Sequence, residues 1–375
     1  MYQNYAFFGK GSDTSKLGTV AEHLLREGCK VSLLTVDYDS RWDTRRENVN
    51  GTEIIWLGKM AQFRAMSFSI NAIPFCRQNL REFDLVHIYG YYDLLTPIVA
   101  HYCHQFGIPY FFEPMGMFRP VVRNLGIKRV YQQMIGHKIA QHARCAIATS
   151  EQEQRELLEE GLNSDRVVMR RNGIDTPASM PTRGEMRVRF GIPEGAHVTL
   201  FFGRVVGKKS PDMLIRAFAR AALPTDKWLV IAGPHQEDDY KRDLISLATS
   251  LGVKDRVVFT GAAYGHDKWA MFVDADIFVL PSQHENFGNT AVESAACGTP
   301  VILTNTCGVS QWIDGRAGLV IDHDEQALIN ALERISNDGE LRTRLTESCP
   351  QVASELSWSE PVKQMLDLYR SAMAS

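Results

Sequence analysis

Two carboxylates, Glu285 and Glu293, stand eight positions apart and frame a short polar stretch. The stretch follows an apolar run of strand length, 276–280, and leads into a helical pattern over 290–297. Open α/β sheets bind ligands in loops at the carboxyl ends of their strands. The start of a helix offers free N–H groups and a partial positive charge. The sequence therefore predicts an anion site at this loop, suited to a diphosphate.

The elements that must position this loop alternate along the chain. A second apolar run, 301–303, follows Gly298-Thr299-Pro300, so the stretch reads as strand, loop, helix and strand. The same order opens the chain and predicts a doubly wound α/β fold. The other predicted strands are 2–8, 31–36, 84–89, 110–112, 146–150, 167–169, 198–202, 228–232, 257–260 and 319–321.

Length and composition limit the class of protein. A chain of 375 residues with 45% hydrophobic and 23% charged residues predicts a globular protein of two domains. The net charge of −3 argues against a nucleic-acid partner. Seven scattered cysteines without a C-x-x-C pair, and histidines without ligand spacing, predict no disulfide framework and no metal site. Without a signal-peptide layout or an 18-residue apolar run, we expect a cytoplasmic protein.

Glu293 has an alternative explanation. Thr290 and Glu293 form a T-x-x-E pattern, typical of a capping box, so Glu293 could serve only to cap its helix. The preceding strand, the Glu-Asn-Phe-Gly sequence within the loop and the Cys-Gly-Thr-Pro-Val-Ile sequence after it favour the ligand site.

This context resembles the E-x7-E signature of retaining glycosyltransferases with the two-domain GT-B fold, and more narrowly of family 4. The resemblance implies that Glu285 contacts hydroxyls of the donor sugar and that Glu293 contacts the ribose of the nucleotide. It also implies that backbone N–H groups hold the diphosphate. The residues between the two carboxylates that would supply these contacts are Asn286, Phe287, Gly288, Asn289 and Thr290.

A second stretch, Gly203-Arg204 followed by Lys209, resembles the G-R-x4-K-G motif of the same family. There the arginine and lysine neutralise the donor diphosphate, as a metal ion does elsewhere, so we expect neither metal nor cofactor. Lys208 could take the place of Lys209, and Ser210 stands where the family usually has glycine. Tyr264 is our candidate for contact with the nucleotide base.

The first half of the chain departs from the family at two places. Gly11 and Ser12 lie where the family often has a glycine pair, in a loop under the donor phosphate or facing the acceptor. After the strand 110–112 the family usually carries His-Gly, whereas this chain has Glu113-Pro-Met115-Gly116. Glu113 or a backbone carbonyl would then replace the histidine on the acceptor side, although a purely structural turn explains these residues equally well.

Residues 119–144 contain six lysines and arginines and no Asp or Glu, with apolar residues at helical spacing. One interpretation is a surface that rests on anionic lipid, on the inner face of the membrane, or holds a phosphorylated, lipid-linked acceptor. The other is a helix with a packed face and a solvated basic face. The basic, aromatic segment 59–81 could belong to the same surface.

The resemblance implies two Rossmann-like domains that face a cleft. Residues 1–176 would bind the acceptor, residues 177–357 the donor, and the last helix, within 358–375, would pack back on the first domain. The expected reaction moves a hexosyl unit with retention from a UDP- or GDP-sugar to a glycan, lipid-linked or small-molecule acceptor, in polysaccharide or glycoconjugate synthesis. The alternatives are a nucleotide-sugar epimerase and a non-catalytic nucleotide-sugar-binding protein. Met115, in place of the usual histidine, favours the binding protein.

Overall fold

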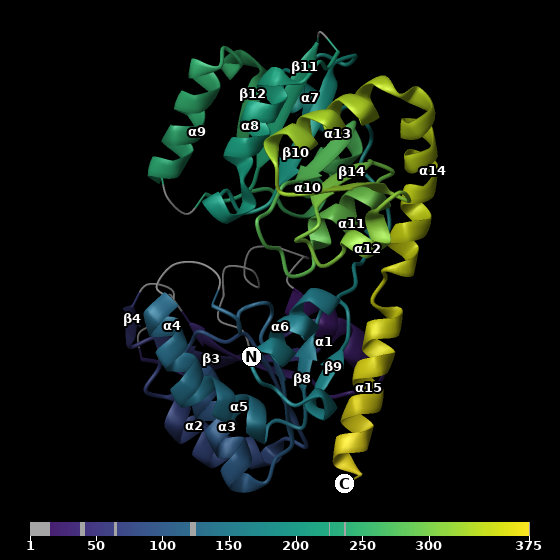
Figure 1. The fold of residues 1–375 in the computed structure, drawn as a ribbon. Coiled ribbons are helices and arrows are strands. Elements are labelled where there is room, and N and C mark those ends of the chain that lie inside the picture. The colour runs from purple at the N-terminus through teal and green to yellow at the C-terminus, as the bar shows by residue number, and fades with distance from the viewer. Residues whose placement is uncertain are drawn as a thin grey trace. The chain divides into compact units, whose positions relative to one another are not determined.

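The computed structural model describes residues 16–37, 42–63, 66–120, 125–224, 226–235 and 238–374, in two compact units (Figure 1). Unit 1 comprises the chain up to Arg171 together with the part from Trp358 onward, and unit 2 comprises Asn172–Ser357. The division falls earlier than the boundary expected at 176/177. Ile174 forms an isolated β-bridge with Ser357, which joins this stretch to unit 2.

Unit 2 contains a parallel sheet of six strands in the order β12-β11-β10-β13-β14-β15. The chain starts in the centre, moves out to one edge, returns to the centre and moves out to the other edge. This order places a topological switch point between β10 and β13, where ligands bind in doubly wound sheets. The strands are β10 (His197–Phe202), β11 (Lys227–Ala232), β12 (Val257–Gly261), β13 (Ile277–Leu280), β14 (Val301–Thr304) and β15 (Gly318–Ile321).

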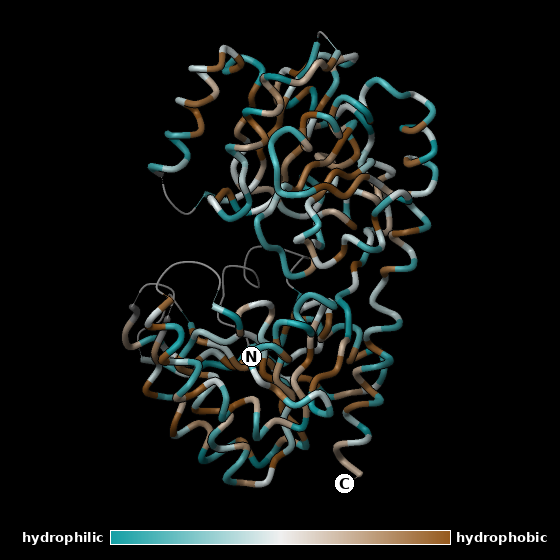
Figure 2. Tube along the Cα trace, viewed as in Figure 1, coloured by the Kyte–Doolittle hydropathy of each residue, from teal (hydrophilic) through white to brown (hydrophobic). Residues whose placement is uncertain are grey.

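Two hydrophobic clusters cover the two faces of this sheet, because successive side chains of a strand point to opposite faces. In β10, Leu200 belongs to one cluster and Phe201 to the other. The first face packs against α7 (Glu185–Phe190), α10 (Gly265–Asp274), α11 (Asn289–Ala296) and α12 (Ser310–Ile313). The second packs against α8 (Pro211–Arg220), α9 (Asp238–Ser250) and α13 (Glu325–Asn337), while α14 (Gly339–Glu355) contributes to both. Hydrophobic and hydrophilic residues alternate along α9, as expected for a helix with one packed face (Figure 2).

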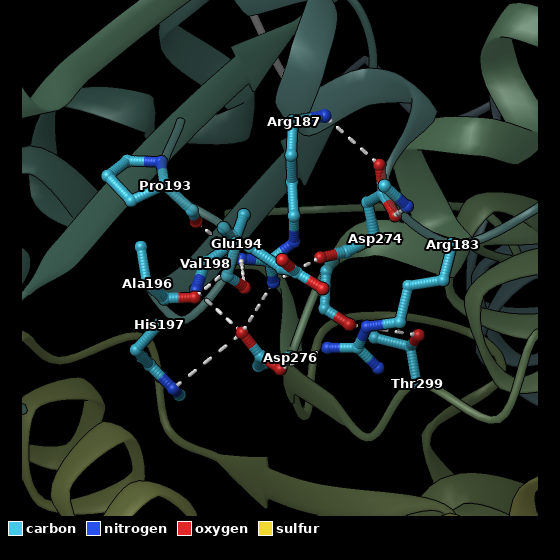
Figure 3. A network of polar contacts seen from close by, with 12 residues as sticks. Arg183, Arg187, Pro193, Glu194, Ala196, His197, Val198, Asp274, Asp276 and Thr299 are labelled. Carbon is cyan, nitrogen blue, oxygen red and sulfur yellow. Dashed lines mark hydrogen bonds and ion pairs between the residues drawn. The ribbon is translucent and has the colours of Figure 1, made fainter. Parts of the chain in front are cut away.

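A polar network fixes α7 to the amino edge of the same sheet (Figure 3). The buried guanidinium of Arg187 donates to the carbonyls of Ala196 at 2.6 Å and Asp274 at 2.8 Å, and to the carboxylate of Asp276 at 3.1 Å. The Asp274 carboxylate accepts from the backbone N–H of Met186 at 2.7 Å. These charges lie at the amino ends of the strands, so we assign them to the fold and not to ligand binding.

The strands that the structure describes in unit 1 form three sheets. Four parallel strands follow the order β6-β7-β8-β9, β3 lies between parallel β1 and antiparallel β2, and β4 pairs with β5. The strands are β1 (Ser32–Asp37), β2 (Arg45–Val49), β3 (Thr52–Gly58), β4 (Ala61–Phe63), β5 (Met66–Phe68), β6 (Val86–Tyr89), β7 (Tyr110–Glu113), β8 (Ala146–Ala148) and β9 (Val167–Met169). The strand predicted over 2–8 lies outside the described residues.

The helices of unit 1 include the last helix of the chain, α15 (Ser359–Met373). Its residues Met365 and Tyr369 pack with Val20, Phe111 and Ile147 in one buried cluster. The other helices are α1 (Lys16–Arg26), α2 (Ala72–Asn79), α3 (Leu95–Phe106), α4 (Leu125–Tyr131), the π-helical turn η3 (Gln132–Gly136), α5 (His137–His142) and α6 (Glu151–Glu159). The described residues also form short 3-10 turns: η2 (Leu80–Glu82), η4 (Ser164–Arg166), η5 (Gly207–Lys209) and η6 (Lys254–Arg256). In the part of the chain that the structure describes, no helix is long and apolar enough to cross a membrane.

Candidate active site

The switch point of unit 2 brings the two predicted motifs together. The loop after β10 carries Arg204, Lys208 and Lys209, and the loop after β13 carries Glu285. Lys209 Nζ lies 2.7 Å from Glu285 Oε2, and both side chains are mostly buried. The two loops are also joined by their backbones, because the N–H of Gln283 donates to the carbonyl of Lys208 at 2.9 Å.

The charges around Glu285 decide its protonation. Burial alone would raise the pKa of Glu285, but the nearby charges of Lys209, Lys208 and Arg204 outweigh burial and hold its pKa below the ordinary value. Glu285 is therefore ionised at neutral pH. Three cations around one carboxylate leave an excess of positive charge, which suits a diphosphate.

Backbone hydrogen bonds fix the loop that carries Glu285. The N–H of Glu285 donates to the carbonyl of Thr306 at 3.0 Å, and its carbonyl accepts from the N–H of Gly308 at 3.0 Å. The N–H of Val309 donates to the carbonyl of Phe287 at 2.8 Å, and the Phe287 ring is buried. The loop is thus held in place before any ligand arrives, as a preorganised site requires.

The start of α11 has the geometry of an anion site. Gly288 precedes the helix with φ 101°, in the left-handed region, and a Cβ there would lie 3.3 Å from Val309 Cγ1. The N-cap Gly288 offers no side-chain cap, and the N–H of Ala291 donates to the carbonyl of Gly288 at 3.0 Å, so the N–H groups of Asn289 and Thr290 precede the first backbone hydrogen bond of the helix. Among the described residues, none donates a hydrogen bond to the buried side-chain oxygen of Asn289.

The capping-box explanation for Glu293 is wrong. The helix begins at Asn289 with Gly288 as its N-cap, so Thr290 lies inside the first turn. Instead, Glu293 Oε1 lies 3.0 Å from Lys268 Nζ, on the neighbouring helix α10. Lys268 is buried and its ammonium lies 4.7 Å from the centre of the Trp269 ring. The pair involves only Oε1 of the Glu293 carboxylate.

Lys268 is the residue that the sequence analysis missed at this site. It belongs to no motif, and its pairing with Glu293 depends on how α10 packs beside α11. A lysine on a helix shows no local signal of an ion-pair partner 25 residues later.

The structure also shows the local environment of three further residues from the sequence analysis, Gly203, Ser210 and Tyr264. A Cβ at Gly203 would lie 3.3 Å from Lys209 Nζ, so glycine lets the lysine pass close to the backbone. Ser210 replaces the usual glycine at a left-handed position, φ 49°, and its hydroxyl lies 2.9 Å from His323 Nε2. Tyr264 is an exposed residue at the start of α10. Gly11 and Ser12 lie outside the described residues.

Glu113 is not placed as we expected. Its carboxylate is fully buried, pairs with Arg170 and Lys16, and lies 3.5 Å from His87 Nε2. Burial alone would raise the pKa of Glu113, but the charges of Arg170 and Lys16 hold its pKa well below the usual range. Because this cluster surrounds the carboxylate inside unit 1, the structure argues against contact between Glu113 and an acceptor.

Met115 and Gly116 form a turn anchored by α6. Both have positive φ, 57° and 72°, and the N–H of Gly116 donates to the buried carboxylate of Glu153. The N–H and hydroxyl of Thr149 donate to the same carboxylate, each at 2.8 Å. The structural account of this turn is therefore well supported, while its place on the acceptor side remains a prediction.

The basic segment 119–144 exposes more than cations. Ile127, Val130 and Met134 are 72%, 54% and 65% exposed, at a spacing of three and four residues that places them on one side of the helix. A solvated basic face alone does not account for these apolar side chains.

Across the described ranges, no group of three or more His, Cys, Asp or Glu side chains is arranged to hold a metal ion.

Two family models match the chain in succession. The model "Glycosyl transferase 4-like domain" matches residues 16–173, and the model "Glycosyl transferases group 1" matches residues 182–352. The matches cover most of the chain and agree with its doubly wound architecture. The chain therefore belongs to the group 1 glycosyltransferases and has the two-domain GT-B fold, which confirms the predicted family and fold.

The individual curated relatives share only part of their sequence with this chain. The chain is 29% identical over 308 residues to D-inositol 3-phosphate glycosyltransferase of Stackebrandtia nassauensis, an alignment that covers 78% of this chain and 69% of the relative. It is 35% identical over 218 residues to the enzyme of the same name from Salinispora tropica, an alignment that covers 54% of this chain and 45% of the relative. The chain thus spans about half the length of some curated relatives that it matches.

Solved structures share the fold at low identity. Sucrose-phosphate synthase from Thermosynechococcus elongatus has a TM-score of 0.77 and 22% identity, covering 96% of this chain and 92% of that chain. HepE from Anabaena, solved in complex with UDP and glucose, has a TM-score of 0.70 and 20% identity, covering 85% and 86%.

Proposed function

We propose that this glycosyltransferase moves a hexosyl unit, with retention, from a UDP- or GDP-sugar to a glycan, lipid-linked or small-molecule acceptor in polysaccharide or glycoconjugate synthesis. The observation that carries the proposal is the Lys209–Glu285 pair at the switch point of unit 2. HepE, a structural neighbour, is described with UDP and glucose, and the curated relatives are named for a phosphorylated polyol. Both facts support a nucleotide-sugar donor and a hydroxyl-bearing acceptor.

Each residue of the site has a proposed task. Arg204 and Lys209 offset the charge that builds on the leaving diphosphate, which the amides of 286–290 also hold. Glu285 accepts hydrogen bonds from donor-sugar hydroxyls, Glu293 from the ribose, and Tyr264 contacts the base. The bond from the anomeric carbon to the diphosphate breaks, and the acceptor oxygen bonds to that carbon on the same face. The acceptor's proton passes to the leaving phosphate, so no protein nucleophile and no metal ion are required.

Isothermal titration of the full chain with UDP, GDP and ADP, in the presence of a chelator, tests the donor site. We expect one nucleotide to bind with a Kd in the micromolar range, about −8 kcal/mol. Arg204→Ala should weaken this binding roughly tenfold or more, because a charge-assisted contact to phosphate is lost. Arg220→Ala, which removes a surface arginine paired with Glu325, is the matched control. Absence of binding by all three nucleotides, or equal losses in both variants, would contradict the proposal.

Lys268 should position Glu293 for the ribose. Wild type is expected to bind the preferred nucleotide about tenfold more tightly than its 2′,3′-dideoxy analogue, since the analogue lacks the ribose hydroxyls that would donate hydrogen bonds to Glu293. In Lys268→Met the mostly buried carboxylate of Glu293 loses its partner, and this ratio of the two Kd values should fall to about two. Lys268→Arg should restore it. The ratio of the two Kd values is the readout, because general destabilisation weakens both ligands equally; an unchanged ratio in Lys268→Met would exclude the positioning role.

We also propose that the basic segment 119–144 lies against anionic lipid on the cytoplasmic face of the membrane. The exposed side chains of Ile127, Val130 and Met134 would enter the interface, and the flanking cations would contact lipid phosphates. This proposal predicts sedimentation with anionic vesicles that high salt weakens. Equal sedimentation with neutral vesicles would contradict it.

A further inference from the structure

A hollow of about 490 Å³ opens on the surface of unit 1, beside α4, η3 and the end of α6. Its volume lies in the range of small-molecule sites and exceeds what a lone phosphate ion fills. We name it the α4–α6 hollow. The side chains that line it and carry hydrogen-bonding groups are Arg119, Arg129, Gln132, Gln133, His137 and Glu160.

The cations of the α4–α6 hollow are not all neutralised by neighbours. Arg119 pairs with Glu159 at 2.6 Å. Arg129 is exposed on α4, and within the described ranges no carboxylate lies within ion-pair distance of it. An exposed guanidinium facing a hollow is suited to bidentate recognition of a phosphate.

The remaining polar groups suit hydroxyls. Gln132 is buried, and its amide nitrogen donates to Glu160 Oε2 at 2.9 Å, which fixes both side chains at the wall. The carboxylate of Glu160 can accept further hydrogen bonds, and Gln133 offers an amide donor and acceptor. A ligand that places a carboxylate against Glu160 would be repelled, whereas a hydroxyl would be bound. The wall therefore combines a phosphate-binding end with hydroxyl-binding groups.

We propose that the α4–α6 hollow binds a phosphorylated polyol or sugar, either free or as the head group of a lipid. That this ligand is the acceptor of the transfer reaction rests on the proposed function; that the hollow binds it does not. The shared chemistry is a phosphate monoester or diester attached to a hydroxylated ring.

Isothermal titration of the full chain without nucleotide tests the soluble form of this ligand. The probes are glucose 6-phosphate and, for comparison, glucose and inorganic phosphate. We expect glucose 6-phosphate to bind more tightly than either, and Arg129→Gln to weaken it about tenfold, the cost of a lost charge-assisted hydrogen bond. Lys138→Gln is the matched control, because Lys138 is an exposed cation of the same segment that does not line the hollow. Both substitutions are at exposed positions of the helical segment, so thermal unfolding should be nearly unchanged in each.

Vesicles test the lipid-linked form. Phosphatidylinositol and phosphatidylserine carry the same net charge, but only the first has a polyol ring. Binding to phosphatidylinositol vesicles that exceeds binding to phosphatidylserine vesicles, and that Arg129→Gln removes more than Lys138→Gln, assigns the hollow to a lipid-linked ligand. Binding of glucose 6-phosphate alone, with the same dependence on Arg129, assigns it to a soluble one.

The proposal is overturned if the chain binds neither glucose 6-phosphate nor phosphatidylinositol vesicles. It is also overturned if Arg129→Gln and Lys138→Gln weaken the binding of these ligands equally. Nucleotide titration of the same samples reports separately on unit 2. Loss of nucleotide binding with intact phosphosugar binding would contradict the proposed function alone, and the reverse result would contradict the hollow alone.

Discussion

Lys209→Met is expected to lower kcat for sugar transfer by about a hundred- to a thousandfold. This is the typical effect of removing one preorganised group that stabilises the negative charge developing in the transition state. The substitution keeps the length of the side chain and removes its charge. It also leaves the mostly buried carboxylate of Glu285 without the ammonium that lies 2.7 Å away. Initial rates with saturating donor measure this effect.

The neighbouring lysine supplies the control. Lys208→Met removes an equal charge whose contribution to the low pKa of Glu285 ranks below that of Lys209, so its effect on kcat should be much smaller. If Lys208→Met proves the more damaging change, our assignment of the motif lysine is wrong.

The pH dependence of kcat distinguishes lost charge from lost structure. In wild type the cations hold the pKa of Glu285 low, so the carboxylate stays ionised as pH falls toward 5. When Lys209 is replaced, fewer cations offset the effect of burial on the Glu285 carboxylate, and its pKa rises. As pH falls, the residual activity of the variant should therefore be lost at a higher pH than that of wild type. An acid limb at the same pH in both enzymes would contradict this mechanism.

The second large effect concerns stability. Arg170→Met should destabilise unit 1 by about 3–5 kcal/mol, because it breaks a fully buried ion pair and leaves Glu113 with fewer partners. In calorimetry the unfolding transition of unit 1 should fall by on the order of 10 °C. Arg119→Met, which breaks the exposed pair with Glu159, should cost about 1 kcal/mol or less. A similar loss in both variants would contradict the assigned importance of the buried cluster.

The sign of the pH effect follows from the depressed pKa of Glu113. The stability that its pairing contributes is fully present above the pKa of an unfolded glutamate, about 4.3. It is lost as pH falls through the lower pKa of the folded state. The stability difference between wild type and Arg170→Met should therefore narrow in acid, which unfolding with denaturant at a series of pH values would measure.

The strands of unit 2 and the loops at their carboxyl ends could be predicted well from sequence. Buried parallel strands are continuous apolar runs that end at glycine or proline, so β10 and β13 lie within one residue of the ranges predicted. The loops that follow them carry the motifs Gly203-Arg204 and Glu285–Glu293. Local sequence is sufficient here because the topology brings the ends of these two strands together.

Other features depend on contacts that local sequence does not show. The strand β2 is almost entirely polar and exposed, and we missed the hairpin with β3, although Asn50-Gly51 between the two strands is a strong turn signal. Glu113 lies at the end of a strand, where a ligand group is expected, yet its partner Arg170 is 57 residues away. The helix α14 continues through Pro350, although proline in a helix interior removes a backbone hydrogen bond and locally predicts a break.

The place of α15 has a consequence for the order in which the protein can mature on the ribosome. Unit 1 combines the chain up to Arg171 with the residues from Trp358 onward, so its last part is synthesised after the whole of unit 2. Across this division of the sequence, the guanidinium of Arg170 lies 5.6 Å from the centre of the Trp358 ring. During synthesis the apolar side chains of Phe111 and Ile147 lack their cover until Met365 and Tyr369 have left the exit tunnel. The nascent chain thus holds an incomplete first half while the whole of unit 2 is translated, and a chain that ends early would keep that apolar surface open to chaperones and to aggregation.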